Sequence, residues 1–592
     1  MRWNLTALYS SFDDPALNQD FEKLEAIQNK MLRDSAGDKP SARDYLEQSI
    51  VDLQELRKLG SRLRSYFHLN QAVESDNQGA ANGLSRMQSY AGEQATILTR
   101  FKLFLKDLDI DSLAKESELI WEHQFILKEM KQQANRLLSE KEEILLAKLR
   151  NTGSVAFSTL QGDNTSYLMI DVVLGGETKT LPLPAVRNLA YAADPAVRKA
   201  GYDAELAAYP RIEKSSAAAL NAIKGEVITV AQMAGYASPL EETIENSRMD
   251  GATLQALMEA IEAYLPEFRR YLKRKAELLG HENGLPFYEL FAPIGEADLT
   301  YTYPEAMEFI IRTYQGVSPD LADFVQQAYD KQWLDIEPRA GKRGGAFCSN
   351  LHVIGESRIM SNFSGSFSNL TTLAHELGHG YHGHNLKHES ILNSGYPMPI
   401  AETASIFNEN LIVQETLRHV DDEAALVILE DAISSANQVI TDIYSRYLFE
   451  TDLFEKRKTR TIQAPELKEM MLAAQKKAYG EGLDSDVLHP YMWINKPHYY
   501  SAGQNFYNFP YAFGLLLANG FIARYQADGP AFMKQYQEFL RQTGQASIPD
   551  VVATMGIDVR DSAFFKSSLE VIKGQIDEFI RRTDDRVAGR MA

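Results

Sequence analysis

The residues most able to do chemistry stand close together in the stretch TTLAHELGHGY, positions 371–381. His375 and His379 are four residues apart, so on an α-helix both imidazoles leave the same face and can bind one metal ion. Glu376 lies about 100° further round such a helix, where its carboxylate can face a water molecule beside the metal. Zinc with an open coordination position activates water and polarises a carbonyl group. The spacing predicts one Zn²⁺ per chain and hydrolysis with Glu376 as general base.

Coincidence is a poor explanation of this motif. With 12 histidines among 592 residues, His-Glu-x-x-His arises by chance in about one such chain in fifty. Gly378 and Gly380 are poor helix formers beside the two histidines, which predicts that another backbone approaches closely there. Three further histidines follow at spacings that fit no better metal site, and we expect them in a loop or on the surface: His382, His384 and His388.

A zinc site of this kind needs a third protein ligand. One known spacing would place a histidine where the chain has Asn385, and another would place a glutamate where it has Pro399. Glu402 and Glu409 are seven residues apart and share one face of an apolar helix, where a carboxylate is costly unless it is paired or metal-bound. We predict that Glu402 binds the metal and that Glu409 hydrogen-bonds a ligand histidine. The alternative for each is an ordinary solvated helix residue.

Composition excludes several functional classes. The chain is 44% hydrophobic and 24% charged with a net charge of −20, which disfavours nucleic acid and anionic membranes as partners. Cys348 is the single cysteine, so no intramolecular disulfide can form. The richest apolar segment, 513–523, is too short to span a membrane, and the first residues contain no apolar core of signal-peptide length. We expect a cytoplasmic protein.

Helical patterns dominate the chain and must position these residues. Apolar residues at three- and four-residue spacing predict helices over 14–150, with 119–149 as one long arm of a helical hairpin. A β-hairpin is expected from 167–173 and 178–183 around two glycines. Helices return after it and dominate again from position 399 to the end, apart from an aromatic-rich loop between 489 and 510.

A second change of pattern precedes the histidine motif. Glycines there separate short apolar pieces that we predict to be the strands of a small sheet beside the metal-binding helix: 346–349, 351–354 and 359–363. The expected fold class is mainly α. We expect an N-terminal helical lobe with the hairpin over 1–195 and a catalytic metallopeptidase domain over 196–592.

Longer motifs extend the case across nearly the whole chain. These are RWNLTALY near the start, PRAGKRGGAFCSN, NFSGSFSNLTTLAHELGH, AETAS with its glutamate 27 positions after His375, and HYYSAGQNFYNFPYAFG. Together they resemble the thimet oligopeptidase and oligoendopeptidase F family of zinc metallopeptidases, with the bacterial oligoendopeptidase F branch fitting best. The resemblance implies a two-lobed helical bowl with zinc at the floor of a deep channel. It also implies cytosolic enzymes that cleave short, unfolded peptides internally.

Two further groups of site residues follow from the resemblance. The family uses an edge strand to pair with the substrate backbone, and the corresponding residues here are Gly345, Ala346 and Phe347. Such pairing forms hydrogen bonds with the peptide main chain and therefore tolerates varied side chains. A buried strand of the small sheet is the alternative.

In the family, a histidine and one or two tyrosines near the C-terminus stabilise the oxyanion. The corresponding residues here are His498, Tyr507 and Tyr511. The match is incomplete, because Gly503 stands where the thimet enzymes have an earlier tyrosine and Tyr511 is one position late. An ordinary core or surface tyrosine is the alternative for both tyrosines.

The sequence therefore predicts a zinc endopeptidase with short peptides as partners, and it does not give an oligomeric state. Two alternatives remain open. A zinc carboxypeptidase or dipeptidyl carboxypeptidase on a related fold would need groups that hold a free C-terminal carboxylate. A non-catalytic peptide-binding protein would not need the carboxylate of Glu376.

Overall fold

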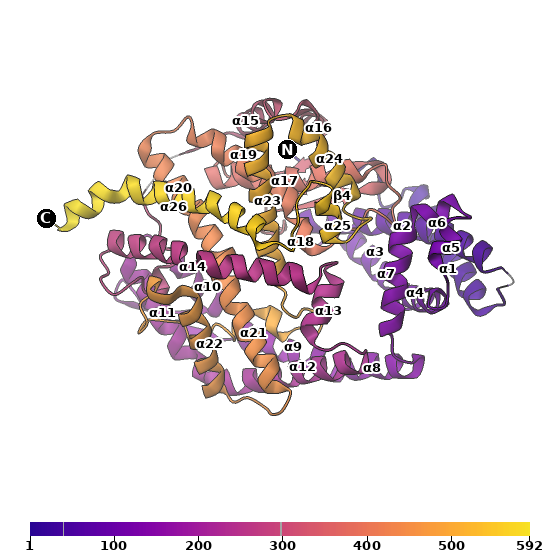
Figure 1. Cartoon of the computed structure of the whole chain (residues 1–592), viewed down its shortest axis with the longest axis horizontal. Coiled ribbons are helices and arrows are strands. Elements are labelled where there is room, and N and C mark those ends of the chain that lie inside the picture. Colours follow the sequence, from indigo (N-terminus) through magenta and orange to yellow (C-terminus); the bar gives the residue numbers. More distant parts are fainter. Residues whose placement is uncertain (40, 296–298, 592) are drawn as a thin grey trace. The chain divides into compact units, whose positions relative to one another are not determined.

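The computed structural model describes residues 1–39, 41–295 and 299–591 and is mainly α-helical (Figure 1). The chain divides into two compact units, each made of three separate segments. Unit 1 comprises Met1–Leu137, Leu299–Glu415 and Arg524–Ile557, and unit 2 comprises Leu138–Asp298, Thr416–Ala523 and Asp558–Ala592. Position 195 falls inside unit 2, and its role as a domain boundary stays a prediction.

Unit 1 contains most of the N-terminal helices, a three-stranded sheet and the helix with the histidine motif. Its elements are α1 (Pro15–Ala36), α2 (Ala42–Val73), α3 (Gln78–Ser89), α4 (Ala91–Leu105), α5 (Ile110–Ala114), α6 (Glu118–Glu122), α7 (Gln124–Arg136), α15 (Tyr303–Gln315), α16 (Pro319–Asp330), β3 (Leu334–Asp335), β4 (Phe347–Leu351), η4 (His352–Ile354), β5 (Glu356–Met360), α17 (Phe367–Leu386), α18 (Met398–Ala401), most of α19 (Thr403–Leu417), α24 (Ala531–Gln542) and α25 (Ile548–Ala553).

The described part of unit 2 is mostly helical and contains one β-hairpin. Its elements are α8 (Glu140–Thr152), α9 (Ser154–Ser166), β1 (Met169–Leu174), β2 (Glu177–Pro182), α10 (Leu183–Asn188), η1 (Leu189–Tyr191), α11 (Pro195–Ala208), η2 (Tyr209–Arg211), α12 (Glu213–Met233), α13 (Pro239–Asn246), α14 (Gly251–Leu279), η3 (Phe287–Glu289), α20 (Asp422–Asn437), η5 (Gln438–Asp442), α21 (Ile443–Arg457), α22 (Ala464–Tyr479), η6 (Gly480–Gly482), η7 (Pro497–Tyr500), most of α23 (Phe509–Asp528) and α26 (Ser562–Met591).

The first helices of unit 1 pack around one apolar core that also supports the sheet. Figure 1 shows α1 to α7 gathered together, and their buried leucines and aromatic residues form a cluster that includes Leu351 of β4 and Met360 of β5. Side-chain caps start several of these helices, as where Asp14 accepts a hydrogen bond from the amide of Ala16. Helix α2 therefore lies against the sheet with one face in the core.

The small sheet has the order β3-β5-β4, so β4 is an edge strand. Strand β4 pairs antiparallel with β5, with Phe347 opposite Met360 and Leu351 opposite Glu356, and β3 pairs parallel with β5. Among the described residues, no strand pairs with the outer edge of β4. One predicted strand is wrong: the backbone of 352–354 forms the 3₁₀ turn η4, because Gly355 with φ of 64° closes a tight turn into β5.

Helix α17 packs closely on both the sheet and α19. The Asn350 side chain of β4 donates a hydrogen bond to the carbonyl of His379 at 3.0 Å, and a Cβ on Gly383 would lie 2.3 Å from the Asn350 side chain. On another face, a Cβ on Gly378 would lie 2.5 Å from the Ala404 carbonyl oxygen. The close approach expected at Gly378 is therefore present.

The mainly α fold, the sheet beside the histidine-motif helix and the N-terminal hairpin are confirmed. Strand β1 pairs antiparallel with β2. The long helix predicted over 119–149 is wrong: it is divided at His123 and again before Ser139, which caps α8 in a capping box with Glu142. No helix among the described residues meets the length and hydropathy needed to cross a bilayer.

Replacing Gly378 with alanine should destabilise unit 1, because the new methyl group would overlap the backbone of α19. Overpacking of this kind costs about 1–3 kcal/mol. We expect a lower denaturant midpoint in urea unfolding followed by circular dichroism. Gly92→Ala in α4 is the matched control, since a Cβ there meets nothing within 4 Å, and it should unfold at or above the wild-type midpoint. Equal midpoints for the two variants would contradict this view of the packing.

Candidate metal centre and peptidase site

Helix α17 presents the two histidines of the motif to one point. The helix starts at the N-cap Ser366, whose side chain accepts a hydrogen bond from the amide of Asn369. The rings of His375 and His379 lie 5.0 Å apart between centroids at an angle of 81°. Their side chains keep 26% and 19% of their accessible surface, so a small ligand can reach both.

Glu402 completes a cluster of three possible metal ligands. One carboxylate oxygen lies 3.3 Å from His375 Nε2 and 3.6 Å from His379 Nε2, and the three donor atoms fall within 4.8 Å of one another. Glu402 stands between α18 and α19, and Ser405 Oγ donates a hydrogen bond to its carboxylate at 3.1 Å. Two imidazole nitrogens and a carboxylate are a donor set typical of catalytic zinc sites. The residues therefore fit such an ion.

Glu409 steadies one of these histidines. Its Oε2 lies 3.0 Å from His375 Nδ1, so a proton on Nδ1 can be donated to the carboxylate while Nε2 faces the cluster. Burial lowers the pKa of His375, but the hydrogen bonds that its imidazole donates to Glu402 and Glu409 outweigh burial and raise the pKa to about 10. The two carboxylates thus stabilise positive charge at this place, as a bound cation requires.

Glu376 is a buried carboxylate with a free oxygen. It is 7% exposed, one oxygen accepts a hydrogen bond from the backbone of Cys348, and Oε2 has no hydrogen-bond partner among the described residues. Burial raises its pKa to about 7, against a lowering by the neighbouring His375. A carboxylate with a pKa near neutrality can both accept and return a proton at working pH.

The residues expected to contact substrate backbone lie at the open edge of the sheet. Gly345 and Ala346 lead into β4, which begins at Phe347. Gly345 has φ of 79° and is exposed, and a Cβ there would meet nothing within 4 Å. Residues 347–350 are only partly buried, which disfavours the alternative of a fully buried strand. An extended peptide could therefore add to this edge.

The candidate oxyanion donors cluster within unit 2. The rings of His498 and Tyr507 stack at 4.9 Å and 18°, and the Tyr511 hydroxyl donates a hydrogen bond to the Tyr507 hydroxyl at 3.3 Å. Burial first, then the charges of Arg446 and Lys496, lowers the pKa of His498 to about 4. The imidazole is therefore neutral at pH 7.

A buried ion pair that the sequence analysis did not single out holds the loop before Tyr507. Lys224 Nζ lies 2.8 Å from Glu450 Oε1 and 2.8 Å from Asn505 Oδ1, and Glu450 Oε2 accepts a hydrogen bond from the Phe506 amide at 3.0 Å. Phe506 has φ of 50°, an uncommon conformation for a bulky residue. A lysine in the apolar stretch LNAIKGEVITV was the available signal.

One of the later histidines, His382, is not where it was expected. His382 is fully buried in α17, stacks on Tyr396 at 3.9 Å, and lies 2.8 Å through Nε2 from Thr543 Oγ1. His384 is also helical and lies beside Phe324. The expected loop or surface position is wrong for His382, because α17 continues to Leu386 and packs against α24, whereas His384 on the same helix is only half-buried.

Comparison with known proteins identifies the family. A family model described as "Peptidase family M3" matches residues 188–571, well over half of the chain, and one described as "Oligopeptidase F" matches 104–168. The chain belongs to peptidase family M3. As a member it is a metalloendopeptidase, and the resemblance stated from the motifs is confirmed.

Relatives of this M3 peptidase match it over nearly their full length. Oligopeptidase PepF of Bacillus subtilis is 24% identical, covering 97% of this chain and 86% of that protein. Group B oligopeptidase PepB of Streptococcus agalactiae is 22% identical, with coverages of 98% and 96%.

Solved structures share the fold at low identity. A protein from Chlamydophila abortus superposes with a TM-score of 0.84 at 20% identity, covering 98% of both chains. Oligoendopeptidase-F from Enterococcus faecium gives a TM-score of 0.71 at 18% identity, covering 96% of this chain and all of that one.

Glu409→Gln should weaken metal binding about 10- to 100-fold, because the amide is a poorer acceptor for the His375 Nδ1 proton. We would measure the zinc affinity of the purified variant by competition with a chromophoric chelator. Glu415→Gln, near the end of α19, is a control for the loss of one carboxylate on that helix. A wild-type affinity in Glu409→Gln would show that this contact does not support the metal site.

Proposed function

We propose that this M3 peptidase is a zinc-dependent endopeptidase that hydrolyses internal bonds of short, unfolded oligopeptides with water as nucleophile. The observation that carries the proposal is the convergence of His375, His379 and Glu402 within 4.8 Å. Beside them lies the buried Glu376, one oxygen of which has no hydrogen-bond partner among the described residues. Family membership and relatives named as oligopeptidases support it.

The roles divide among the residues of α17 to α19. His375, His379 and Glu402 would hold one zinc ion, which supplies Lewis-acid activation of water and of the scissile carbonyl. Glu376 takes a proton from the attacking water and passes it to the leaving amine, which its raised pKa favours. Glu409 keeps the Nδ1 proton of His375 and so directs Nε2 toward the ion.

Substrate binding in this proposal uses main chain more than side chains. Gly345, Ala346 and Phe347 offer backbone groups at an exposed strand edge, to which an extended peptide adds as another strand. A folded protein rarely presents a free extended segment, so short unfolded peptides are the substrates that suit such an edge.

The oxyanion role of His498, Tyr507 and Tyr511 stays a prediction. A neutral imidazole and a phenol can donate hydrogen bonds to developing negative charge, and such donors act most strongly when they are preorganised. The stacked arrangement of His498 and Tyr507 supports this assignment. An unchanged kcat in Tyr507→Phe would remove that tyrosine from the role.

Internal cleavage is tested with a peptide that is acetylated at its N-terminus and amidated at its C-terminus. We expect mass spectrometry to show cleavage of the capped peptide at internal bonds, because the proposed site recognises main chain and needs no free terminus. If only the uncapped peptide is cleaved, and it loses C-terminal residues or dipeptides stepwise, the protein is an exopeptidase and the proposal is wrong.

Glu376→Gln should retain the metal and lower kcat by about 10²- to 10⁴-fold, because glutamine cannot accept the proton of the attacking water. Metal content is measured by plasma mass spectrometry and turnover with a quenched fluorescent peptide. Glu308→Gln on the exposed face of α15 is the control. Chelation of the wild type should abolish turnover and added zinc should restore it. Wild-type turnover in Glu376→Gln or in the chelated protein would exclude the proposed chemistry.

A further inference from the structure

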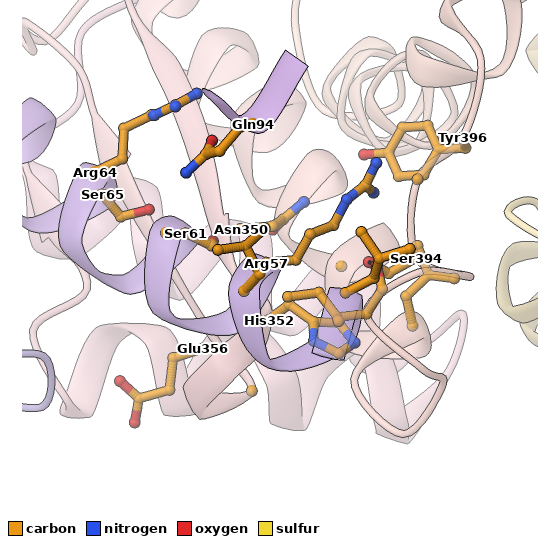
Figure 2. Close-up of a pocket in the computed structure, with 18 of the residues that line it drawn as sticks. Arg57, Ser61, Arg64, Ser65, Gln94, Asn350, His352, Glu356, Ser394 and Tyr396 are labelled. Atoms are coloured by element: carbon orange, nitrogen blue, oxygen red, sulfur yellow. Dashed lines mark hydrogen bonds between the residues drawn. The ribbon is translucent and has the colours of Figure 1, made fainter. Parts of the chain in front are cut away.

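A cavity of about 640 Å³ in unit 1 lies against α17, beyond the metal-binding histidines. Its walls come from α2, α4, the turn between β4 and β5, α17 and the loop before α18 (Figure 2). Gly383 and Leu386 of α17 line it, and Gly383 stands one helical turn after His379. The cavity is thus adjacent along the helix to the proposed catalytic residues.

One face of α2 gives the cavity a basic wall. Arg57, Ser61, Arg64 and Ser65 line it at the spacing of a single helix face. Figure 2 shows the Arg57 side chain reaching from α2 into the cavity toward Tyr396. Among the described residues, neither arginine has a hydrogen-bond or ion-pair partner, although solvent reaches both side chains.

The charge of the cavity is not balanced by its own carboxylate. Glu356 is the acidic residue in the described lining, and it already pairs with Arg358 at 2.9 Å and Lys331 at 3.7 Å. His352 also lines the cavity, but burial lowers its pKa and leaves it neutral at pH 7. The wall is therefore positively charged in a chain whose net charge is −20. Unpaired arginines facing a cavity suit an anionic ligand.

The edge strand leads from the catalytic residues to this cavity. The backbone amide of Cys348 in β4 donates a hydrogen bond to the Glu376 carboxylate. The Asn350 side chain, also in β4, donates a hydrogen bond to the carbonyl of His379. Asn350 and His352 then line the cavity. A peptide that adds to β4 beside Glu376 and extends toward the C-terminal end of that strand therefore runs into the cavity.

We propose that this cavity is a substrate subsite that binds a carboxylate of the peptide, with the Arg57 guanidinium as its main partner. The inference rests on the proposed peptidase function and adds a specificity to it. The carboxylate comes either from an acidic side chain or from the C-terminus of the peptide, since both present the same planar pair of oxygens to the guanidinium fork. Ser61 and Tyr396 offer further polar groups in the same cavity.

The test compares matched quenched fluorescent peptides on the full-length, metal-loaded enzyme. The parent peptide is neutral and capped; one series carries glutamate or glutamine at each position in turn, and another carries a free or amidated C-terminus. We expect wild-type kcat/KM to favour a carboxylate at one position, or at the C-terminus, by about 10- to 100-fold over the amide. The series that shows the preference identifies the source of the carboxylate.

Arg57→Gln should remove this preference, and Arg57→Lys should retain part of it. Arg43→Gln, which removes a charge paired with Glu47 at the start of the same helix, should keep the full preference. A preference that survives in Arg57→Gln, or that is absent from the wild type while neutral peptides are cleaved, overturns the subsite alone. Failure of the wild type to cleave any peptide overturns the proposed function instead.

Discussion

The geometry of the site depends on how closely the backbones of α17 and α19 approach. His375 and His379 leave one helix and Glu402 precedes another, so their donor atoms converge only if the two helices are nearly in contact. Gly378 makes this contact possible, because its backbone lies where any Cβ would overlap Ala404. The sheet fixes another side of α17 through Asn350. The candidate metal centre is thus held by packing of one helix, α17, against protein on two of its faces.

The same packing leaves one carboxylate free to act. Glu402 and Glu409 have partners in His375, Ser405 or both, whereas Glu376 keeps an oxygen without a hydrogen bond among the described residues. Burying such an oxygen costs free energy, and the raised pKa of Glu376 reflects that cost. A perturbed pKa of this kind is expected for a group that must exchange protons during a reaction.

Local chemistry made much of the site predictable. The four-residue spacing of His375 and His379 needs only one helix, and the small sheet and the β-hairpin follow from glycine and apolar patterns. Other features depend on contacts between distant residues. Lys224 and Glu450 are more than 200 positions apart in the sequence. The basic residues of α2, including Arg57, form the wall of a cavity only because β4 and α17 supply its other walls. Two expectations fail for local reasons. The capping box of Ser139 and Glu142 starts a new helix within a stretch of continuous apolar periodicity, and Gly355 closes a turn where a strand is expected.

Because unit 1 is made of three separate segments, it cannot be completed until its last segment has been synthesised. The proposed ligands are translated by position 402. Helix α24 packs on α17, and Thr543 directly after α24 lies beside the buried His382, yet both belong to a segment that begins at Arg524. A nascent chain can therefore expose the histidine helix without its cover for the time needed to translate more than a hundred residues. Unit 1 can therefore be completed only after the segment that begins at Arg524 has been translated.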